Sequence, residues 1–226
     1  MTTAETILDA REIADVAVGN FSDESAIIAA NDGLQEFVDE TKILDTTEIF
    51  DVAEDDNSYP LQARAAYVER VWYDGKRITH RSMEELDKTV HGWKTLTGRP
   101  AHFFLDSSSR ALILYPIPSE ELDQGLEVRE YLKPAKMSLS DPDAELEIAE
   151  QFHHAIAQYL AYRMLLKVGE PGAAREQRKE FEIAKVKARK WKRSAVVTAR
   201  SRRIPAMAGQ GRGNINLGGD FPVYPI

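Results

Sequence analysis

The stretch AELEIAEQFHHAIAQYLAYRMLLKV (residues 144–168) and the run REQRKEFEIAKVKARKWKRSA (residues 175–195) decide the predicted fold. The first is apolar nearly all the way round, and the second is amphipathic and strongly basic. Between them, Gly169-Glu170-Pro171-Gly172 combines the Gly that usually ends a helix with the Pro that usually starts one. We therefore expect a long helical hairpin, with helices over about 143–168 and 173–199.

The first arm of this hairpin carries more apolar residues than one buried stripe requires. Such a helix is covered on more than one side, and in a chain of this length we expect another subunit to supply part of the cover. The candidate subunit-packing residues are Phe152, Ile156, Tyr159, Leu160, Tyr162 and Leu166.

The second arm predicts a basic helix surface. Nine Lys or Arg residues and no acid occur between Lys185 and Arg203. Such a run suits either the phosphates of DNA or an acidic protein partner. A DNA-binding protein that uses residues 185–203 is the alternative function, although no helix-turn-helix or zinc ligand set accompanies them. The candidate surface residues are Lys185, Lys187, Arg189, Lys190, Lys192 and Arg193.

Upstream of the hairpin, the sequence predicts two helices and then a β-rich segment. Thr2 with Glu5 forms a capping box that opens a helix over about 3–18, and Ser22 can cap a second helix over about 22–41. Alternating apolar runs over about 46–133, with a hairpin signal at Asp74-Gly75, predict a mostly antiparallel insertion. The fold class is therefore α+β, with one domain over 1–203.

The C-terminal segment differs in composition from this domain. Residues 204–226 (IPAMAGQGRGNINLGGDFPVYPI) contain five Gly and three Pro and lack helical periodicity. Because the segment ends in apolar and aromatic residues, we expect an extended C-terminal arm that folds onto a partner. Together with the end of the basic helix, it is the candidate partner-binding segment. Its residues are Arg200, Arg202, Arg203, Arg212, Phe221, Val223, Tyr224 and Ile226.

The charges of the chain are divided between its two parts. The net charge is −8, but residues 175–226 hold 13 basic and 4 acidic residues, which gives +9 and leaves −17 for residues 1–174. This polarity favours head-to-tail association between copies, or docking on an acidic partner. The chain has no Cys, no signal-peptide pattern and no membrane-length apolar run, so we expect synthesis in the cytoplasm and no membrane partner.

No group of residues predicts catalysis or a cofactor. Glu150 and His153 have the Glu-x-x-His spacing of di-iron bundles, but the second arm offers no His to complete such a site. The Gly-rich run at 209–214 lacks the strand and helix of a dinucleotide site. We therefore expect no enzyme activity, no catalytic residues, no metal and no cofactor.

The order of these elements resembles that of head-to-tail adaptor, or connector, proteins of tailed bacteriophages, the group that includes the podophage adaptors. The resemblance covers about residues 3–195. It rests on the order of segments more than on any one of them. The segments are FSDESAIIAANDGLQEFVDET, IFDVAEDDNSYPL, VERVWYDGKRITHRSMEELD, HGWKTLTGRPAHFFLD, ALILYPIP and REQRKEFEIAKVKARKWKR.

The resemblance implies a structural virion protein at the head–tail junction. Such adaptors form a ring, typically of twelve subunits, beneath the portal protein and present a docking surface to a tail, nozzle or stopper protein. Genomic DNA passes through the ring without sequence-specific binding. The resemblance therefore implies three kinds of protein partner: copies of the chain itself, the portal and a tail component. We expect the candidate partner-binding segment, from Arg200 to Ile226, to be the portal-binding one.

Overall fold

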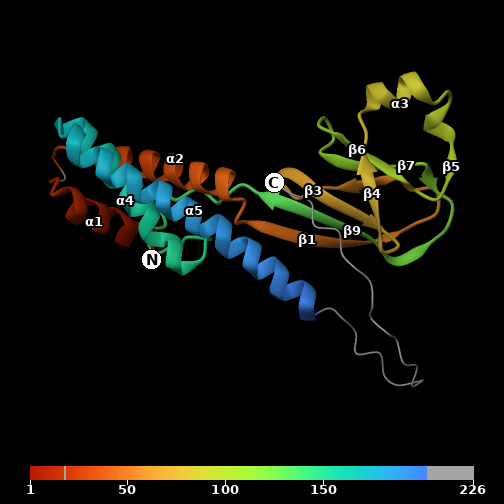
Figure 1. The fold of residues 1–226 in the computed structure, drawn as a ribbon. Coiled ribbons are helices and arrows are strands. Elements are labelled where there is room, and N and C mark those ends of the chain that lie inside the picture. Colours follow the sequence, from red (N-terminus) through yellow and green to blue (C-terminus); the bar gives the residue numbers. More distant parts are fainter. Residues whose placement is uncertain (18, 203–226) are drawn as a thin grey trace, which may run out of the picture.

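Four helices form a bundle at one end of an elongated molecule in the computed structural model, which describes residues 1–17 and 19–202 (Figure 1). They are α1 (Thr3–Ala14), α2 (Asp23–Thr41), α4 (His153–Val168) and α5 (Pro171–Arg202). The central helix α4 packs against the other three. Most of its apolar residues therefore lie in the core of the bundle, together with Leu34, Phe37 and Phe181.

A β-sheet forms the other end of the molecule. Its strand order is β1-β9-β3-β4-β6-β7-β2, and only the β4–β6 pair is parallel. A two-residue pair, β5 with β8, and the short helix α3 lie beside it. The bounds are β1 (Asp45–Val52), β2 (Ser58–Pro60), β3 (Ala65–Tyr73), β4 (Lys76–His80), α3 (Met83–Thr89), β5 (Thr97–Gly98), β6 (His102–Asp106), β7 (Ala111–Tyr115), β8 (Ile117–Pro118) and β9 (Leu122–Leu132).

The alternation of residue types explains this sheet. Val71, Leu126 and Val128 are fully buried and belong to one core cluster, whereas Glu127 and Arg129, which alternate with them along β9, are only partly buried. The β3–β4 turn at Asp74-Gly75 has two positive φ angles, 46° and 68°, as a two-residue hairpin turn requires. The predicted α+β class is confirmed, and the β segment lies between the helices of the bundle in the sequence.

The first helix is shorter than predicted. It was expected over about 3–18, but α1 ends at Ala14, where Asp15 adopts a left-handed conformation with φ 52°. The Asp15 N–H donates back to the carbonyls of Arg11 and Glu12, which closes the last turn. The capping box of Thr2 with Glu5 is present as predicted.

The central helix also starts later than predicted. α4 begins at His153, after a 3-10 turn (Glu150–Phe152), and not near residue 143. Residues 142–144 instead give their carbonyls to α1: Ala4 N donates to Pro142 O at 2.9 Å, and Thr3 N donates to Ala144 O at 3.0 Å. These bonds satisfy N–H groups that the first turn of a helix leaves without partners. An α-helix over 143–149 would withdraw the Ala144 carbonyl, and the segment instead forms a turn and a bend.

The second arm of the hairpin is longer than predicted. α5 begins at Pro171 and continues to Arg202, whereas a helix over about 173–199 was expected. At 1.5 Å per residue, its 32 residues span roughly 48 Å, about twice the length of the 16-residue α4. The C-terminal half of α5 therefore projects beyond the bundle toward the sheet side (Figure 1). The predicted C-terminal arm, 204–226, lies outside the described residues.

Candidate interaction surfaces

A buried ion-pair network joins α5 to α2. Lys185 is only 1% exposed, and its Nζ lies 2.8 Å from carboxylate oxygens of Glu36, Glu40 and Glu182. An ammonium group has three N–H donors, so three acceptors can satisfy it. Burial lowers the pKa of Lys185, but the hydrogen bonds with these carboxylates outweigh it and raise the pKa above the ordinary value.

Two arginines extend the network on either side of Lys185. Arg178 forms a forked pair with Glu36, at 3.1 Å and 2.6 Å, and Arg189 Nη2 lies 2.6 Å from Glu40 Oε2. Burial raises the pKa of Glu36, but the hydrogen bonds from Arg178 and Lys185 outweigh it and lower the pKa. The negative charges of α2 thus hold the basic face of α5 against the bundle.

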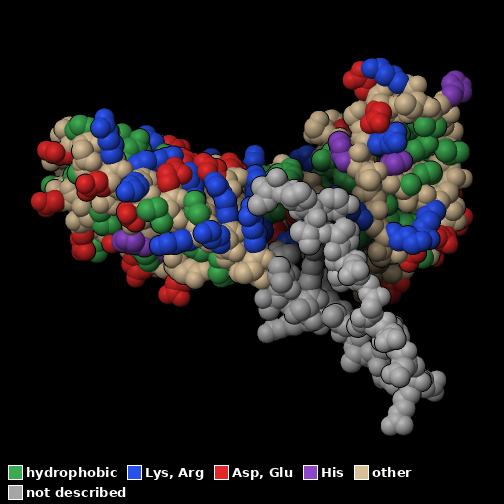
Figure 2. Space-filling view, viewed as in Figure 1, with side chains coloured by type: hydrophobic (Ala, Val, Ile, Leu, Met, Phe, Trp, Pro, Cys, Tyr) green, Lys and Arg blue, Asp and Glu red, His purple; other side chains and the backbone are tan. Residues whose placement is uncertain are grey.

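The six residues of the predicted basic helix surface therefore divide into two groups. Lys185, Arg189 and Lys192 pair with acids of α2, α5 or β1, and so their charge is balanced within the chain. Lys187, Lys190 and Arg193 remain exposed. Figure 2 shows the Lys and Arg side chains along α5. The free positive charge on this stretch is about half of what the sequence alone suggests.

A cleft lies where α5 passes the sheet, and we call it the basic cleft. Its volume is about 500 Å³. The sheet contributes β3 and β9, and the bundle contributes the end of α2 and the middle of α5. The lining residues are Glu40, Thr41, Lys42, Glu69, Arg70, Arg129, Tyr131, Arg189, Lys192 and Arg193.

Asp45, at the start of β1, adds a carboxylate beneath the basic cleft. Lys192 Nζ lies 3.0 Å from Asp45 Oδ1, and Arg129 Nε lies 2.8 Å from Asp45 Oδ2 and 3.2 Å from Glu69 Oε2. Burial lowers the pKa of Lys192, and the opposing effect of Asp45 does not fully offset it. These pairs make the floor of the cleft rigid and nearly neutral.

The rim of the basic cleft carries the surplus charge. Six cations line the cleft, against two lining acids and Asp45, so three positive charges are in excess. Within the described residues, Lys42 and Arg193 have no ion-pair partner. Lys42 Nζ lies 4.8 Å from the centre of the Tyr67 ring, a cation–π contact that leaves its charge available. The cleft is therefore a cationic concavity on a chain with net charge −8.

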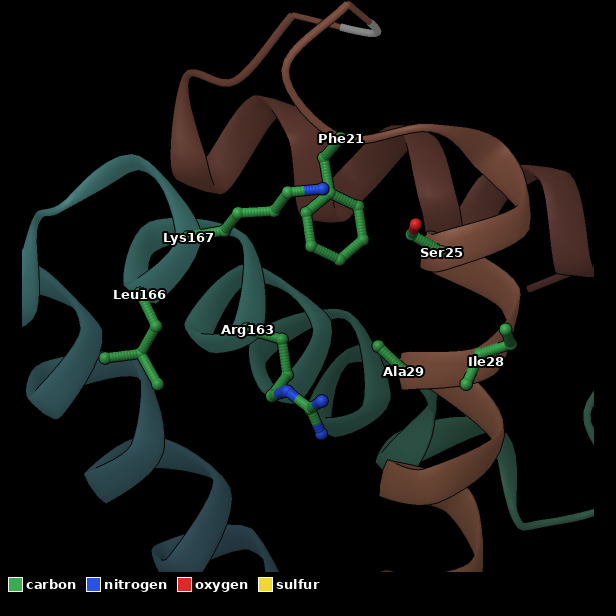
Figure 3. A pocket seen from close by; sticks show the side chains of 7 residues that line it. All are labelled: Phe21, Ser25, Ile28, Ala29, Arg163, Leu166 and Lys167. Carbon is green, nitrogen blue, oxygen red and sulfur yellow. The ribbon is translucent and has the colours of Figure 1, made fainter.

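A second concavity lies between α2 and α4 at the far end of the bundle (Figure 3). Its volume is about 460 Å³. Ile28 and Leu166 are 63% and 45% exposed on its two sides, and Lys167 Nζ lies 5.0 Å above the Phe21 ring. It combines apolar side chains with cationic groups, and we call it the α2–α4 groove. It is lined by Phe21, Ser25, Ile28, Ala29, Arg163, Leu166 and Lys167.

The predicted subunit-packing residues lie at different depths. Phe152, Ile156, Tyr159 and Leu160 are buried within the chain itself, since α4 is already surrounded by α1, α2 and α5. Tyr162 is half-buried, and only Leu166 is exposed. The apolar character of α4 is thus explained by its central place in the bundle.

The histidines of the Glu-x-x-His pattern are occupied by local contacts. His153 Nε2 lies 2.7 Å from the Ile148 carbonyl, and its Nδ1 lies 2.8 Å from the amino group of Met1. His154 Nδ1 lies 2.7 Å from Asp9 Oδ2. Over residues 1–17 and 19–202, no three His, Asp or Glu side chains gather as a metal site would require, and no helix there is long and apolar enough to cross a membrane.

The described residues thus combine a buried ion-pair network, a cationic cleft and a partly apolar groove, which are surfaces suited to contacts with other proteins. The chain belongs to the SU10 adaptor protein family, whose sequence model matches residues 1–204. No curated protein matches it in sequence. Family membership confirms the resemblance to phage head-to-tail adaptors and implies a structural, non-enzymatic virion protein that interacts with other virion proteins.

Of the predicted portal-binding residues, Arg200 and Arg202 lie in the last turns of α5. Arg203, Arg212, Phe221, Val223, Tyr224 and Ile226 lie outside the described residues. The sequence did not predict the acidic partners of the α5 cations, which are Glu36 and Glu40 on α2 and Asp45 on β1. Their only signal in the sequence is the four-residue spacing of Glu36 and Glu40, which places both on one helix face.

Proposed function

We propose that this protein forms the head-to-tail adaptor ring of a tailed bacteriophage beneath the portal, with twelve subunits as the family resemblance implies. The family match over residues 1–204 is the observation that carries the proposal. The ring extends the channel through which genomic DNA passes, and it presents a docking surface to a tail, nozzle or stopper protein. Closed cyclic rings need two different complementary surfaces on each subunit, which an elongated, two-ended molecule supplies.

The proposed portal contact is the end of α5 together with the segment that follows it. In support, α5 continues to Arg202, and its last turns extend beyond the other helices of the bundle (Figure 1). The predicted contact residues after the helix are Arg203, Arg212, Phe221, Val223, Tyr224 and Ile226. Cations with aromatic anchors suit an interface in which a few large side chains supply most of the affinity.

Deletion of residues 204–226 tests this contact. We expect a folded protein with an unchanged unfolding transition and without measurable binding to the portal of the same virus. The matched control is the full-length chain with Lys187→Ala and Lys190→Ala, which removes two exposed cations of α5 and should still bind. Normal portal binding by the truncated chain would exclude the proposed contact.

The ring neighbour is proposed to cover the exposed end of α4. Leu166 is the exposed member of the predicted subunit-packing set, and Ile28 faces it across the α2–α4 groove (Figure 3). Leu166→Asp should leave the monomer folded but lower the yield of rings on the portal in electron micrographs. Leu160→Asp places a charge in a fully buried position and should unfold the subunit instead.

The alternative function, DNA binding through residues 185–203, is less well supported. Three of its six candidate cations are already paired with acids of the same chain. Binding of the isolated protein to duplex DNA with a steep salt dependence would favour it.

A further inference from the structure

We propose that the basic cleft of one subunit receives an acidic tip of the next subunit in the ring, so that this contact sets the head-to-tail direction of assembly. The inference rests on the proposed function and adds the surfaces that meet. It commits to a second copy of the chain as the occupant of the cleft.

The acidic tip is formed by two turns at the end of the sheet furthest from the bundle. One turn joins β1 to β2, and the other joins β8 to β9. A hydrogen bond from Asp55 N to Pro118 O, at 3.0 Å, holds the two turns together. Their exposed acids form one surface, which we call the acidic tip: Glu54, Asp55, Asp56, Glu120, Glu121 and Asp123.

The acidic tip keeps its charge within the described part of the chain. None of its six carboxylates takes part in an ion pair there. The nearby β3–β4 hairpin carries Lys76 and Arg77, and its Asp74 pairs with Arg99, but acids remain in the majority around the tip. The carboxylate of Glu120 is close enough to contribute to the raised pKa of Tyr73, after the larger effect of burial. An unpaired concentration of charge of this kind is available to a partner.

The two surfaces are complementary in charge. The basic cleft is a concavity with three surplus positive charges, and the acidic tip is a pair of joined turns with six exposed acids. A volume of about 500 Å³ accommodates a few side chains of a turn, whereas a DNA duplex is far wider than such a cleft.

Their placement on one subunit favours assembly between copies. The tip lies at the start of β9 and the cleft at its end, about eight residues apart, which is roughly 26 Å at 3.3 Å per residue. A subunit therefore cannot place its own tip in its own cleft. Two unlike surfaces at opposite ends of a rigid sheet produce a heterologous contact, which closes into a ring or continues as a filament.

Charge reversal tests the contact directly. Lys42→Glu with Arg193→Glu reverses the unpaired cations of the cleft, and Glu54→Lys with Glu121→Lys reverses two acids of the tip. We expect each double variant to weaken subunit association at low salt by at least about 10-fold. The combination of all four substitutions should restore assembly, because the charges again match. Lys187→Glu with Lys190→Glu, on residues that do not line the cleft, has the same charge change and should assemble normally.

Cysteine cross-linking then identifies the residues that meet, since the chain has no Cys of its own. Full-length protein with Glu54→Cys and Arg193→Cys, assembled on the portal and oxidised, should yield a ladder of dimers, trimers and higher oligomers. Glu54→Cys with Lys187→Cys should yield none. A ladder that stops at the dimer would overturn the head-to-tail contact in favour of a two-fold one.

The outcomes separate this inference from the proposed function. If rings are seen on the portal but no cross-linked ladder forms, the tip-to-cleft contact is wrong and the adaptor function stands. The same conclusion follows if both double variants assemble normally while the variant with all four substitutions does not. If the cleft reversal reduces binding to duplex DNA and the tip reversal leaves assembly unchanged, the cleft serves DNA and the inference is overturned. If unmodified protein forms no ring on the portal, the proposed function itself fails.

Discussion

Replacing Lys185 with Met should destabilise the subunit measurably. Lys185→Met keeps the length of the side chain but removes an ammonium group that is 1% exposed and contacts three carboxylates at 2.8 Å. Removing one partner of a fully buried pair costs about 3–5 kcal/mol. Here Glu36, Glu40 and Glu182 keep contacts with Arg178 or Arg189, and their side chains are 27%, 41% and 45% exposed. Water and the arginines therefore still stabilise the remaining carboxylates in part, and we expect the free energy of unfolding to fall by about 2–3 kcal/mol.

The assay is chemical or thermal unfolding followed by circular dichroism. For a domain of this size, 1 kcal/mol corresponds to about 2–4 °C in Tm, so the variant should melt about 4–12 °C lower. Lys187→Met, on the exposed side of the same helix, is the control and should change stability by less than about 0.5 kcal/mol. If the two variants melt together, the network contributes no stability and the reasoning is refuted.

The pH dependence provides a second check on the same network. The pKa of Glu36 is lowered in the folded protein, so its contribution is present above the unfolded pKa and is lost as the pH falls through the folded pKa. The pKa of Lys185 is raised, so its contribution persists at neutral pH and is lost only above the ordinary lysine pKa. The difference between Lys185→Met and the unmodified chain should therefore shrink below about pH 4. A constant difference from pH 7 to pH 3 would contradict the electrostatic explanation.

Two further predictions concern other parts of the fold. Gly33→Ala should cost about 1–3 kcal/mol of stability, because a Cβ there would lie 2.5 Å from Tyr159 Cδ1. In the control Gly172→Ala, the new Cβ meets no atom within 4 Å, so this variant should be neutral or slightly stabilising. Equal unfolding transitions of the two variants would refute the close approach of α2 to α4. Glu130 is fully buried, and burial raises its pKa, so its contribution to stability falls as the pH rises through the folded pKa. Glu130→Gln should therefore gain stability relative to the unmodified chain as the pH rises above the ordinary glutamate pKa of about 4.5. Denaturant unfolding below and above that pH would show no relative gain if the carboxyl were solvated.

Local signals predicted most of the elements. Capping at Thr2 and Ser22 placed two helix starts correctly, because a side chain that accepts a bond from the N–H three residues later acts over a short range. Asp74-Gly75 predicted its hairpin for a similar reason, since the positive φ angles are a property of the turn itself. The late start of α4 was missed because the carbonyls of residues 142–144 bond to α1, which lies about 140 residues away in the sequence.

The sequence by itself determined the α+β class, the helical hairpin, the division of charge and the family. These depend on composition, periodicity and the order of segments, which are properties of neighbouring residues. Only the tertiary structure decided which charges of α5 are free: Lys185 is buried among carboxylates of α2 and α5, while Arg193 stands at the rim of a cleft. Both are cations eight residues apart in one basic run. The ion-pair partner of a charged side chain depends on which elements pack around it. Those elements can lie far away in the sequence, so the pattern of charges along α5 does not predict them.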